Sequence, residues 1–462
     1  MFTDRSIGGA EVALKQIRLD LEQRSLAAVR RLLPDREIET VCRAAGLAWR
    51  RRLLTPTVVV WHMLLAALWP EFSFAASWQS LWQPLVAGLP GAAGRSPSSG
   101  SLAKARARVP LDVWERLFAG LAARLATLGA AVNCWRGLRV VLLDGLTISM
   151  PDQPALLEEF GTGHGGRSRD RYRYPLARLV VLSLAESLTL LAYRVGGYRE
   201  SEPALAAGLL AALRPGDLLV GDRRFAAAHY YARYLAAGIQ FLTRLHQRQK
   251  IGRLPRLAEY SRGDFVTRLP LNPVYRRRDP QLPEAVTVRL IQVPARVRGR
   301  REVIWLATSL LDVEAYPARE VAERYLRRWR IETLIREAKV GLGADVLRSR
   351  TPAGVRKELA ARLAALNLVR GLMLEAALAH GVAPLRLSFV GARRALLNFA
   401  PALAVTPPER QAEVWAALFL ELATQQVPER PGRNEPRAVR REKKHYPALR
   451  STRRDWRRHH AA

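Results

Sequence analysis

The sequence predicts an α/β core between two helical regions. Residues 1 to about 115 and about 317 to 427 repeat apolar side chains at intervals of three and four, which is typical of amphipathic helices. Short β-rich runs fill the stretch between them. With 462 residues, 49% of them hydrophobic, the chain is long enough for several domains with sizeable cores.

The charge of the chain indicates a polyanionic partner. The sequence has 74 Lys or Arg against 41 Asp or Glu, a formal net charge of +33, and only seven of the cations are Lys. The planar guanidinium of Arg matches phosphate oxygens with paired hydrogen bonds. A phosphate-rich partner is therefore predicted, with nucleic acid ahead of membrane.

Cysteine usage and hydropathy exclude several protein classes. Cys42 and Cys134 are too few for a disulfide framework or a four-thiolate zinc site. The sequence does not open with a basic start and an apolar core, and its longest apolar run, residues 58–69, is too short to cross a bilayer. We expect a cytoplasmic protein that does not bind membranes.

The N-terminal region predicts helices and a basic segment. Pro34 and Asp35 are typical of a helix start. After a loop rich in Gly, Pro and Ser, the segment SLAKARARVP carries Lys104, Arg106 and Arg108, which could line DNA. An ordinary solvated helix face explains each of these three cations equally well.

The central region predicts a mixed sheet. Strands are expected at 137–145, at 177–195 as two strands joined near Glu186 and Ser187, at 217–222 and at 239–245, with helices at 202–213 and 226–238. This order does not alternate strictly, so the sheet is expected to be mixed. Two further strands are predicted at 285–293 and 301–310.

The C-terminal region predicts helices and then a charged tail. The helical pattern after Pro317 is interrupted where Pro352, Pro384 and Pro407 occur. Residues 428–462 contain twelve Lys or Arg and four acids with little apolar periodicity. They indicate an extended basic arm, with a solubilising tail as the alternative.

Two carboxylates end predicted strands. Asp144 closes the apolar run RVVLLD, and Asp222 closes LLVGD. Either residue alone could be a helix cap or a turn residue. Two such strand ends in a chain of this charge favour a site for Mg²⁺, because hard cations are held by carboxylates at the rim of a sheet.

A third carboxylate lies in the segment RYLRRWRIETLIREAK. At 100° per residue, four polar side chains fall on one narrow helix face, whereas the apolar residues of the segment fall opposite. The four are Tyr325, Arg328, Glu332 and Lys339. An ordinary solvated face with paired charges is the alternative.

The spacing Tyr-x2-Arg-x3-Glu-x6-Lys resembles the signature of bacterial DDE transposases of the insertion sequence 4 family. Other segments agree in order, namely LLDGLTISMPD, YRESEP, GDRRF and LRLSFVGARRALLNF. The resemblance covers most of the chain. One departure is Leu146, where the family often has Thr.

The resemblance implies a ribonuclease-H-like core in which Asp144, Asp222 and Glu332 are the catalytic acids and hold two Mg²⁺ ions, for which Mn²⁺ can substitute. Arg328 and Lys339 would bind DNA phosphates, and Tyr325 would hydrogen-bond one. The implied domains are a helical DNA-binding region at 1–115, a catalytic core at 116–250 and 315–385, an inserted β-rich subdomain at 251–314, a helical region at 386–427 and the basic arm at 428–462.

The implied activity is cut-and-paste transposition of an insertion sequence in a bacterial cytoplasm. A homodimer would pair two terminal inverted repeats, cleave them and join the freed ends to target DNA. In this family cleavage commonly passes through a DNA hairpin. Trp305 could support the displaced base of such a hairpin, although a Trp on a strand is more often a core residue. Two alternatives stay open at this point: a related nuclease without strand transfer, and a domesticated DNA-binding protein without catalysis.

Overall fold

The computed structural model describes residues 30–49, 53–87, 96–163, 174–247, 249–297 and 300–428, together with Arg458. The chain forms two compact units. The helical unit comprises 1–128, 148–177 and 336–462, and the sheet unit comprises 129–147 and 178–335. The predicted basic arm lies outside the described residues, apart from its first residue and Arg458.

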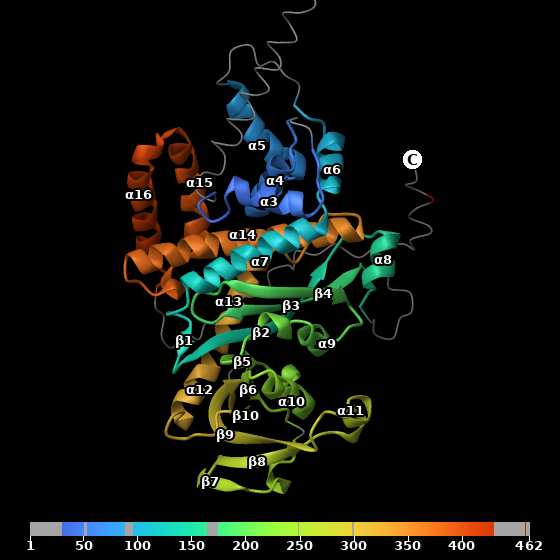
Figure 1. Ribbon diagram of the computed structural model, residues 1–462, viewed down its shortest axis with the longest axis vertical. Helices are drawn as coiled ribbons and strands as arrows, with labels where there is room; N and C mark the ends of the chain where they lie inside the picture. Colours follow the sequence, from blue (N-terminus) through green and yellow to red (C-terminus); the bar gives the residue numbers. More distant parts are fainter. Residues whose placement is uncertain are drawn as a thin grey trace, which may run out of the picture. The chain divides into compact units, whose positions relative to one another are not determined.

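The sheet unit is built on one sheet with the strand order β4-β3-β2-β5-β6-β10-β9-β8-β7, and β1 pairs with β2 beside this path (Figure 1). The strands are β1 Cys134–Trp135, β2 Leu138–Ser149, β3 Leu176–Leu184, β4 Leu190–Gly197, β5 Asp217–Gly221, β6 Gln240–Arg244, β7 Ala258–Ser261, β8 Asp264–Pro270, β9 Ala285–Val297 and β10 Arg300–Thr308. The helices are α9 Glu202–Ala207, α10 Ala228–Ala236, α11 Pro273–Arg278, α12 Ala318–Leu326 and α13 Arg330–Arg336, with short 3-10 turns η1 Leu210–Ala212, η2 Arg223–Phe225, η3 Ile251–Arg253 and η4 Arg327–Trp329.

The half of the sheet from β4 to β6 confirms the predicted ribonuclease-H-like fold class. In chain order its strands lie third, second, first, fourth and fifth, and β2, β5 and β6 run parallel. The turn between β3 and β4 closes where Leu184 accepts a hydrogen bond from the N–H of Leu188, at the predicted join. The parallel strands are mostly buried where they pair with one another, which explains why these stretches are continuous apolar runs in the sequence.

The strands between 258 and 308 continue this sheet. β10 pairs antiparallel with β6, β9 with β10, and β8 with both β9 and β7. The sequence predicted β9 and β10. It did not predict β7, which has only four residues, or β8. The hydrogen bonding of the sheet continues from β6 into these strands and marks no boundary at 251 or 314. The separate subdomain at 251–314 therefore stays a prediction.

The helical unit is arranged around one long helix, α14, which packs against α4, α7, α15 and α16 (Figure 1). Its start was predicted: Thr351 accepts a hydrogen bond from Gly354 and Pro352 occupies the first turn. The elements of this unit are α3 Asp35–Ala44, α4 Pro56–Leu68, α5 Phe74–Ala87, α6 Ser99–Arg108, α7 Leu111–Leu128, α8 Pro154–Phe160, the π-helical η5 Glu337–Gly341, α14 Pro352–Ala379, η6 Pro384–Arg386, α15 Phe389–Val405, η7 Pro408–Arg410 and α16 Gln411–Thr424.

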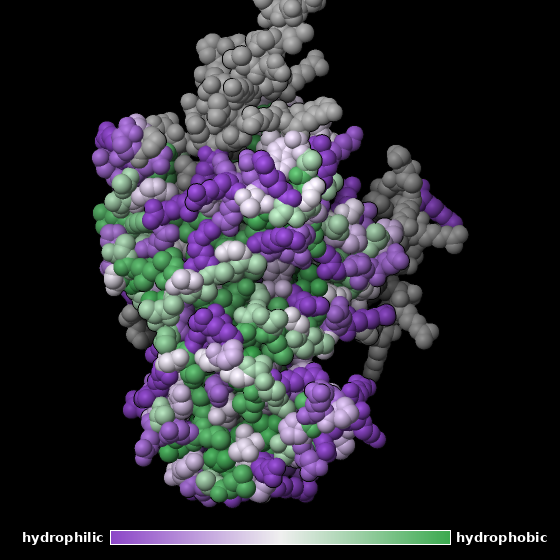
Figure 2. Space-filling view, in the orientation of Figure 1, coloured by the Kyte–Doolittle hydropathy of each residue, from purple (hydrophilic) through white to green (hydrophobic). Residues whose placement is uncertain are grey.

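The longest apolar run of the sequence forms α4, in which every residue is buried. A helix that is apolar on all sides requires such a buried place. None of the helices in the described ranges is both long and apolar enough to cross a membrane. Figure 2 shows apolar and hydrophilic side chains mixed over the visible face of each unit.

The segment 318–341 departs from the expected single regular helix. It consists of α12, the 3-10 turn η4, α13 and the π-helical η5. A 3-10 turn has three residues per turn and a π-helix more than an α-helix, so an angle of 100° per residue does not hold across them. Ile331, Leu334 and Ala338 are buried as predicted, but Tyr325 and Arg328 are buried too.

Candidate active site

The two predicted strand-end carboxylates lie side by side. In the parallel pair β2 and β5, Leu143 is the partner of Gly221, so the next residues along the two strands are Asp144 and Asp222. Neighbouring strands lie about 4.8 Å apart. Residues at equal register on parallel strands point to the same side of a sheet, which brings these two acids together.

Asp144 differs from the expectation in one respect. It does not end its strand, because β2 continues to Ser149; what ends at Leu143 is the pairing with β5. Asp222 directly follows β5 and accepts a hydrogen bond from the N–H of Arg224 at 2.8 Å. It therefore also fills the capping role that the sequence had left open.

The environment of Asp144 disfavours its charge. The pKa of Asp144 is raised to about 6, chiefly by burial, and the nearby charges of Asp222 and Glu202 act in the same direction. The N–H of Gly145, which donates to Asp144 at 2.8 Å, and the guanidinium of Arg328 act in the opposite direction. A buried carboxylate next to two others is a place where a cation would be stabilised.

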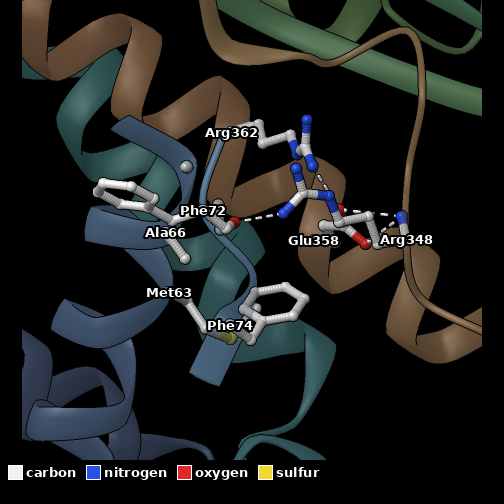
Figure 3. Close-up of a pocket in the computed structure, with 9 residues that line it drawn as sticks. Met63, Ala66, Phe72, Phe74, Arg348, Glu358 and Arg362 are labelled. Atoms are coloured by element: carbon white, nitrogen blue, oxygen red, sulfur yellow. Dashed lines mark hydrogen bonds and ion pairs between the residues drawn. The ribbon is translucent and has the colours of Figure 1, made fainter. Parts of the chain in front are cut away.

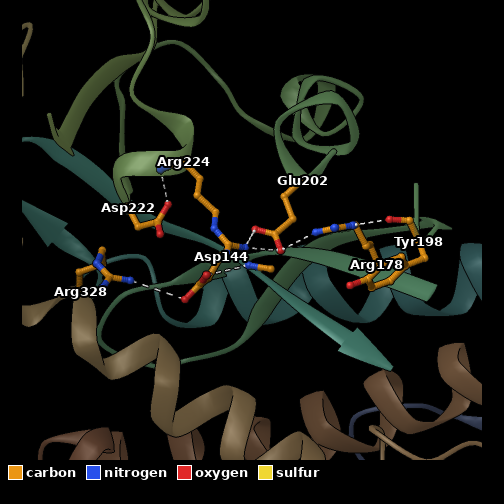
Figure 4. Close-up of polar contacts among 8 residues, drawn as sticks. Asp144, Arg178, Tyr198, Glu202, Asp222, Arg224 and Arg328 are labelled. Carbon is orange, nitrogen blue, oxygen red and sulfur yellow. Dashed lines mark hydrogen bonds and ion pairs between the residues drawn. The ribbon is translucent and has the colours of Figure 1, made fainter. Parts of the chain in front are cut away.

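Arg328 is a cation beside this acid pair. Its Nη1 lies 3.5 Å from an oxygen of Asp144, and only 8% of the residue is exposed (Figure 4). Its buried Nε has no hydrogen-bond partner among the described residues. Tyr325 is also buried; burial raises the pKa of its phenol, and the charge of Arg328 lowers it. Arg328 thus retains an unused donor beside the acids.

Glu332 lies one helical turn beyond Arg328 on α13 and is exposed. Partial desolvation raises the pKa of Glu332, and Arg328 lowers it. Over the described residues, no three His, Cys, Asp or Glu side chains lie close enough to hold a metal ion. The structure therefore brings Asp144 and Asp222 together, whereas Glu332 is linked to them through Arg328. Lys339 belongs to the helical unit, in η5.

Two residues next to the acid pair were not singled out from the sequence. Glu202, at the start of α9, is only 5% exposed and lies in the segment YRESEP. Arg224 donates from Nη1 to both of its carboxylate oxygens at 2.7 Å, as Figure 4 shows. The signal that could have identified them was their place in two segments of the resemblance: Glu202 lies in YRESEP, and Arg224 lies in GDRRF two residues after Asp222.

An exposed aromatic side chain adjoins the site. Trp329 is 55% exposed, and the guanidinium of Arg328 lies 5.4 Å from its ring centroid. Trp305 packs edge-on against Phe265 with ring centroids 5.8 Å apart, in keeping with the core role that a strand Trp usually has. The exposed ring is the one that a DNA base could stack on.

The three N-terminal cations behave differently from one another. Lys104 and Arg108 are exposed on α6, beside a cavity that Trp49 and Val59 also line. Arg106 lies over the ring of Phe74, 3.8 Å from its centroid, and burial lowers its pKa. Arg106 is thus held in the packing of the helical unit.

A smaller cavity in the helical unit is lined by Met63, Phe72 and Phe74 on one side and by a charged cluster on the other (Figure 3). Glu358 and Arg362 form the cluster, with an Arg362 Nη2 to Glu358 oxygen distance of 2.6 Å. Both residues are at most 4% exposed and fully bonded. This cavity offers no free chemical group to a ligand.

Comparison with known proteins agrees with this geometry. Residues 135–368, about half of the chain, match the family model described as the transposase DDE domain, and residues 23–119 match the N-terminal domain of insertion element 4 transposases. The chain belongs to the DDE transposases of the insertion sequence 4 family. The matched range contains both acids and Glu332.

Individual relatives are more distant. The transposase InsG for insertion sequence element IS4 of Escherichia coli (strain K12) is 28% identical over 318 residues, which are 68% of this chain and 70% of that protein. The piggyBac transposase, solved by cryo-EM in a synaptic complex with hairpin DNA, is 9% identical with a TM-score of 0.40, covering 94% of this chain and 85% of that one. As a DDE transposase the chain is an enzyme of phosphoryl transfer on DNA.

Proposed function

We propose that this transposase cuts and joins DNA with Asp144, Asp222 and Glu332 as its catalytic acids. The observation that carries the proposal is the register of β2 and β5, which sets Asp144 beside Asp222 on one side of the sheet. Glu332 is the third acid of the family signature, one turn from the Arg328 that contacts Asp144.

The carboxylate chemistry of Asp144, Asp222 and Glu332 suits divalent cations, although the three described side chains do not form one cluster. Asp144 and Asp222 repel each other, and the pKa of Asp144 is raised to about 6, so positive charge between them is favourable. Asp144, Asp222 and Glu332 would hold the ions. When bound, two Mg²⁺ ions would activate a water or a DNA 3′-OH and stabilise the leaving oxygen of an in-line displacement at phosphorus. Mn²⁺ also prefers oxygen ligands and would bind the same carboxylates in place of Mg²⁺.

The neighbouring cations would hold the DNA backbone. Arg328 has a buried Nε without a partner among the described residues, and a phosphate oxygen would satisfy it. Tyr325, buried beside Arg328, would donate its phenol hydrogen to the same backbone. Lys339 would bind a phosphate as a point charge; its change to Ala should lower the salt dependence of end binding by about one unit.

Cleavage and joining are both phosphoryl transfers, so one site can perform excision and then insertion. In the route proposed for this chain, the freed 3′-OH attacks the opposite strand and forms a hairpin that is later opened. A sharply bent hairpin leaves a base unstacked, and the exposed ring of Trp329 beside Arg328 is suited to stack on it.

The substrate is double-stranded DNA, taken as the terminal inverted repeats of the element and a target site. Exposed Lys104 and Arg108 on α6 would contact the repeats. Because two ends must be processed together, the working form is a homodimer on paired ends. Short inverted repeats that bracket the gene would supply the substrate sequence.

A plasmid assay tests this function. A plasmid that carries two such repeats is incubated with the protein and Mg²⁺, and the products are separated on a denaturing gel. Excision followed by joining to a target plasmid is the expected result. Nicking without joining would instead identify a nuclease, and a gel shift without any cleavage would identify a DNA-binding protein that has lost catalysis.

A further inference from the structure

We propose that Arg224 binds the phosphate at the cleavage point, and that the buried carboxylate of Glu202 holds it there. Arg224 is thus a further DNA-binding residue of the active site, and Glu202 is its positioning residue. The inference rests on the proposed function, since it takes the cleaved phosphate as the ligand.

The position of Glu202 is fixed by its surroundings. The Arg178 Nη1 lies 3.3 Å from one oxygen of Glu202, and Arg178 Nε donates to the carbonyl oxygen of Tyr198 at 2.8 Å. A Cβ built on Gly145 would lie 2.7 Å from the Cδ of Glu202, so this carboxylate lies against the backbone that follows Asp144 (Figure 4). A side chain at position 145 would displace the carboxylate of Glu202 from this place.

Arg224 approaches Glu202 from the side open to solvent. The side chain of Arg224 is 60% exposed, whereas that of Glu202 is 5% exposed. Arg224 makes both of its hydrogen bonds to Glu202 through Nη1. A guanidinium has five N–H donors in a rigid fork, so the tether leaves the other edge of the fork available.

The charge of Arg224 is directed toward the acids. The backbone N–H of Arg224 donates to Asp222 at 2.8 Å, and Asp222 is the neighbour of Asp144 across β2 and β5. Arg178, which is half-buried, already provides Glu202 with an ion-pair partner. The second, exposed arginine therefore adds a positive charge at the rim of the acid pair, where the phosphodiester must lie for the acids to act on it.

The tether also explains why an arginine suits this position. A free Arg side chain would lose considerable rotamer entropy when it binds a phosphate. Because Glu202 holds the guanidinium in advance, less freedom is lost on binding. The matched neighbour Arg223 is also exposed, but none of the ion pairs seen between described residues involves it.

The test measures coupling between Arg224 and one phosphate. A duplex with the terminal repeat is prepared in two forms, one with the natural phosphate at the cleavage point and one with an uncharged methylphosphonate there. Affinity is measured in EDTA, without metal. For the unaltered protein the methylphosphonate should weaken binding about tenfold, as expected for the loss of a charged hydrogen bond.

Arg224→Ala should bind both duplexes with nearly equal affinity, and Arg224→Lys should recover part of the difference. The control Arg223→Ala should retain the full tenfold difference. Glu202→Gln should reduce the difference when Arg224 is present and change nothing further in the Arg224→Ala background. That dependence separates positioning from a general effect on folding.

A full tenfold difference in Arg224→Ala would overturn the inference. The unaltered protein serves as the check on the proposed function itself, because it must cleave the natural duplex when Mg²⁺ is added. Cleavage without coupling to Arg224 refutes the inference alone, whereas absence of cleavage refutes the proposed function.

Discussion

Two buried charge clusters in this chain use the same side chains in opposite ways. In the helical unit, Glu358 accepts hydrogen bonds from the N–H groups of Arg348 and Ser349 and from Arg362, at 2.6 to 3.1 Å (Figure 3). In the sheet unit, counting described residues only, Asp144 accepts one bond from Gly145 and has a guanidinium at 3.5 Å. The first cluster is saturated, and the second is not.

The difference separates structural charges from functional ones. Glu358 connects α14 to the loop before it, and nothing remains for a ligand to satisfy. Around Asp144, two further acids raise its pKa and the Nε of Arg328 has no partner in the described residues. Buried groups left in this condition cost stability unless a ligand completes them, which is typical of active sites.

The largest expected effect is on catalysis in the unsaturated cluster. Asp144→Asn and Asp222→Asn should each lower the rate of DNA cleavage by at least about 10³-fold, because each removes a charge from the acid pair. Cleavage of a labelled repeat duplex in Mg²⁺ measures this rate. A gel shift with the same duplex is the control, and either variant retaining the original rate would exclude that residue from the site.

The saturated cluster should respond in stability. Glu358→Ala leaves Arg362 buried without its partner, so the free energy of unfolding should fall by about 3 to 5 kcal/mol. Urea unfolding followed by circular dichroism measures this change. Asp144→Asn is the matched comparison and should unfold at the same or higher urea concentration. Equal losses in both variants would erase the distinction between the clusters.

The pH dependence sharpens the comparison further. In the unfolded chain an Asp has a pKa near 3.9, whereas burial raises the pKa of Asp144 to about 6 in the folded protein. The unfolded state therefore loses this proton first, and the unaltered protein should lose stability as pH rises from about 4 to about 6. Asp144→Asn should escape this loss.

The stability gap between the two proteins should thus open across that range, reach at most about 3 kcal/mol and stay constant above pH 6. Urea unfolding in EDTA at several pH values measures it. Addition of Mg²⁺ above pH 6 should close the gap, since a cation bound to the folded state stabilises it. If the two proteins already differed in stability at pH 4, the difference would have a cause other than the raised pKa of Asp144.

The sequence predicted the sheet better than the site. The apolar strands β2, β5 and β6 and the turn between β3 and β4 follow from local patterns, and the proline breaks mark the start of α14 correctly. Parallel register cannot be inferred from one strand at a time, so the direct pairing of Leu143 with Gly221 became visible only in the fold.

The helical segment with the family signature shows more clearly what could not be predicted from the sequence. The motif predicts Tyr325, Arg328 and Glu332 as site residues, but regular helical geometry did not anticipate the 3-10 turn η4 or the π-helical η5. Contacts over long sequence distances were equally invisible. Arg224 and Glu202 are 22 residues apart, and only the packing of α9 beside η2 joins them.

The smallest expected effect distinguishes three cations that the sequence treated alike. Arg106 lies over Phe74 and has a buried Nε without a partner among the described residues, so Arg106→Ala should lower the melting temperature by a few degrees. The slope of log affinity for repeat DNA against log salt should stay unchanged.

Lys104→Ala and Arg108→Ala, at exposed positions, should each reduce that slope by about one unit and leave the melting temperature unaltered. A lower slope in Arg106→Ala would mean that this guanidinium leaves the ring of Phe74 when DNA binds.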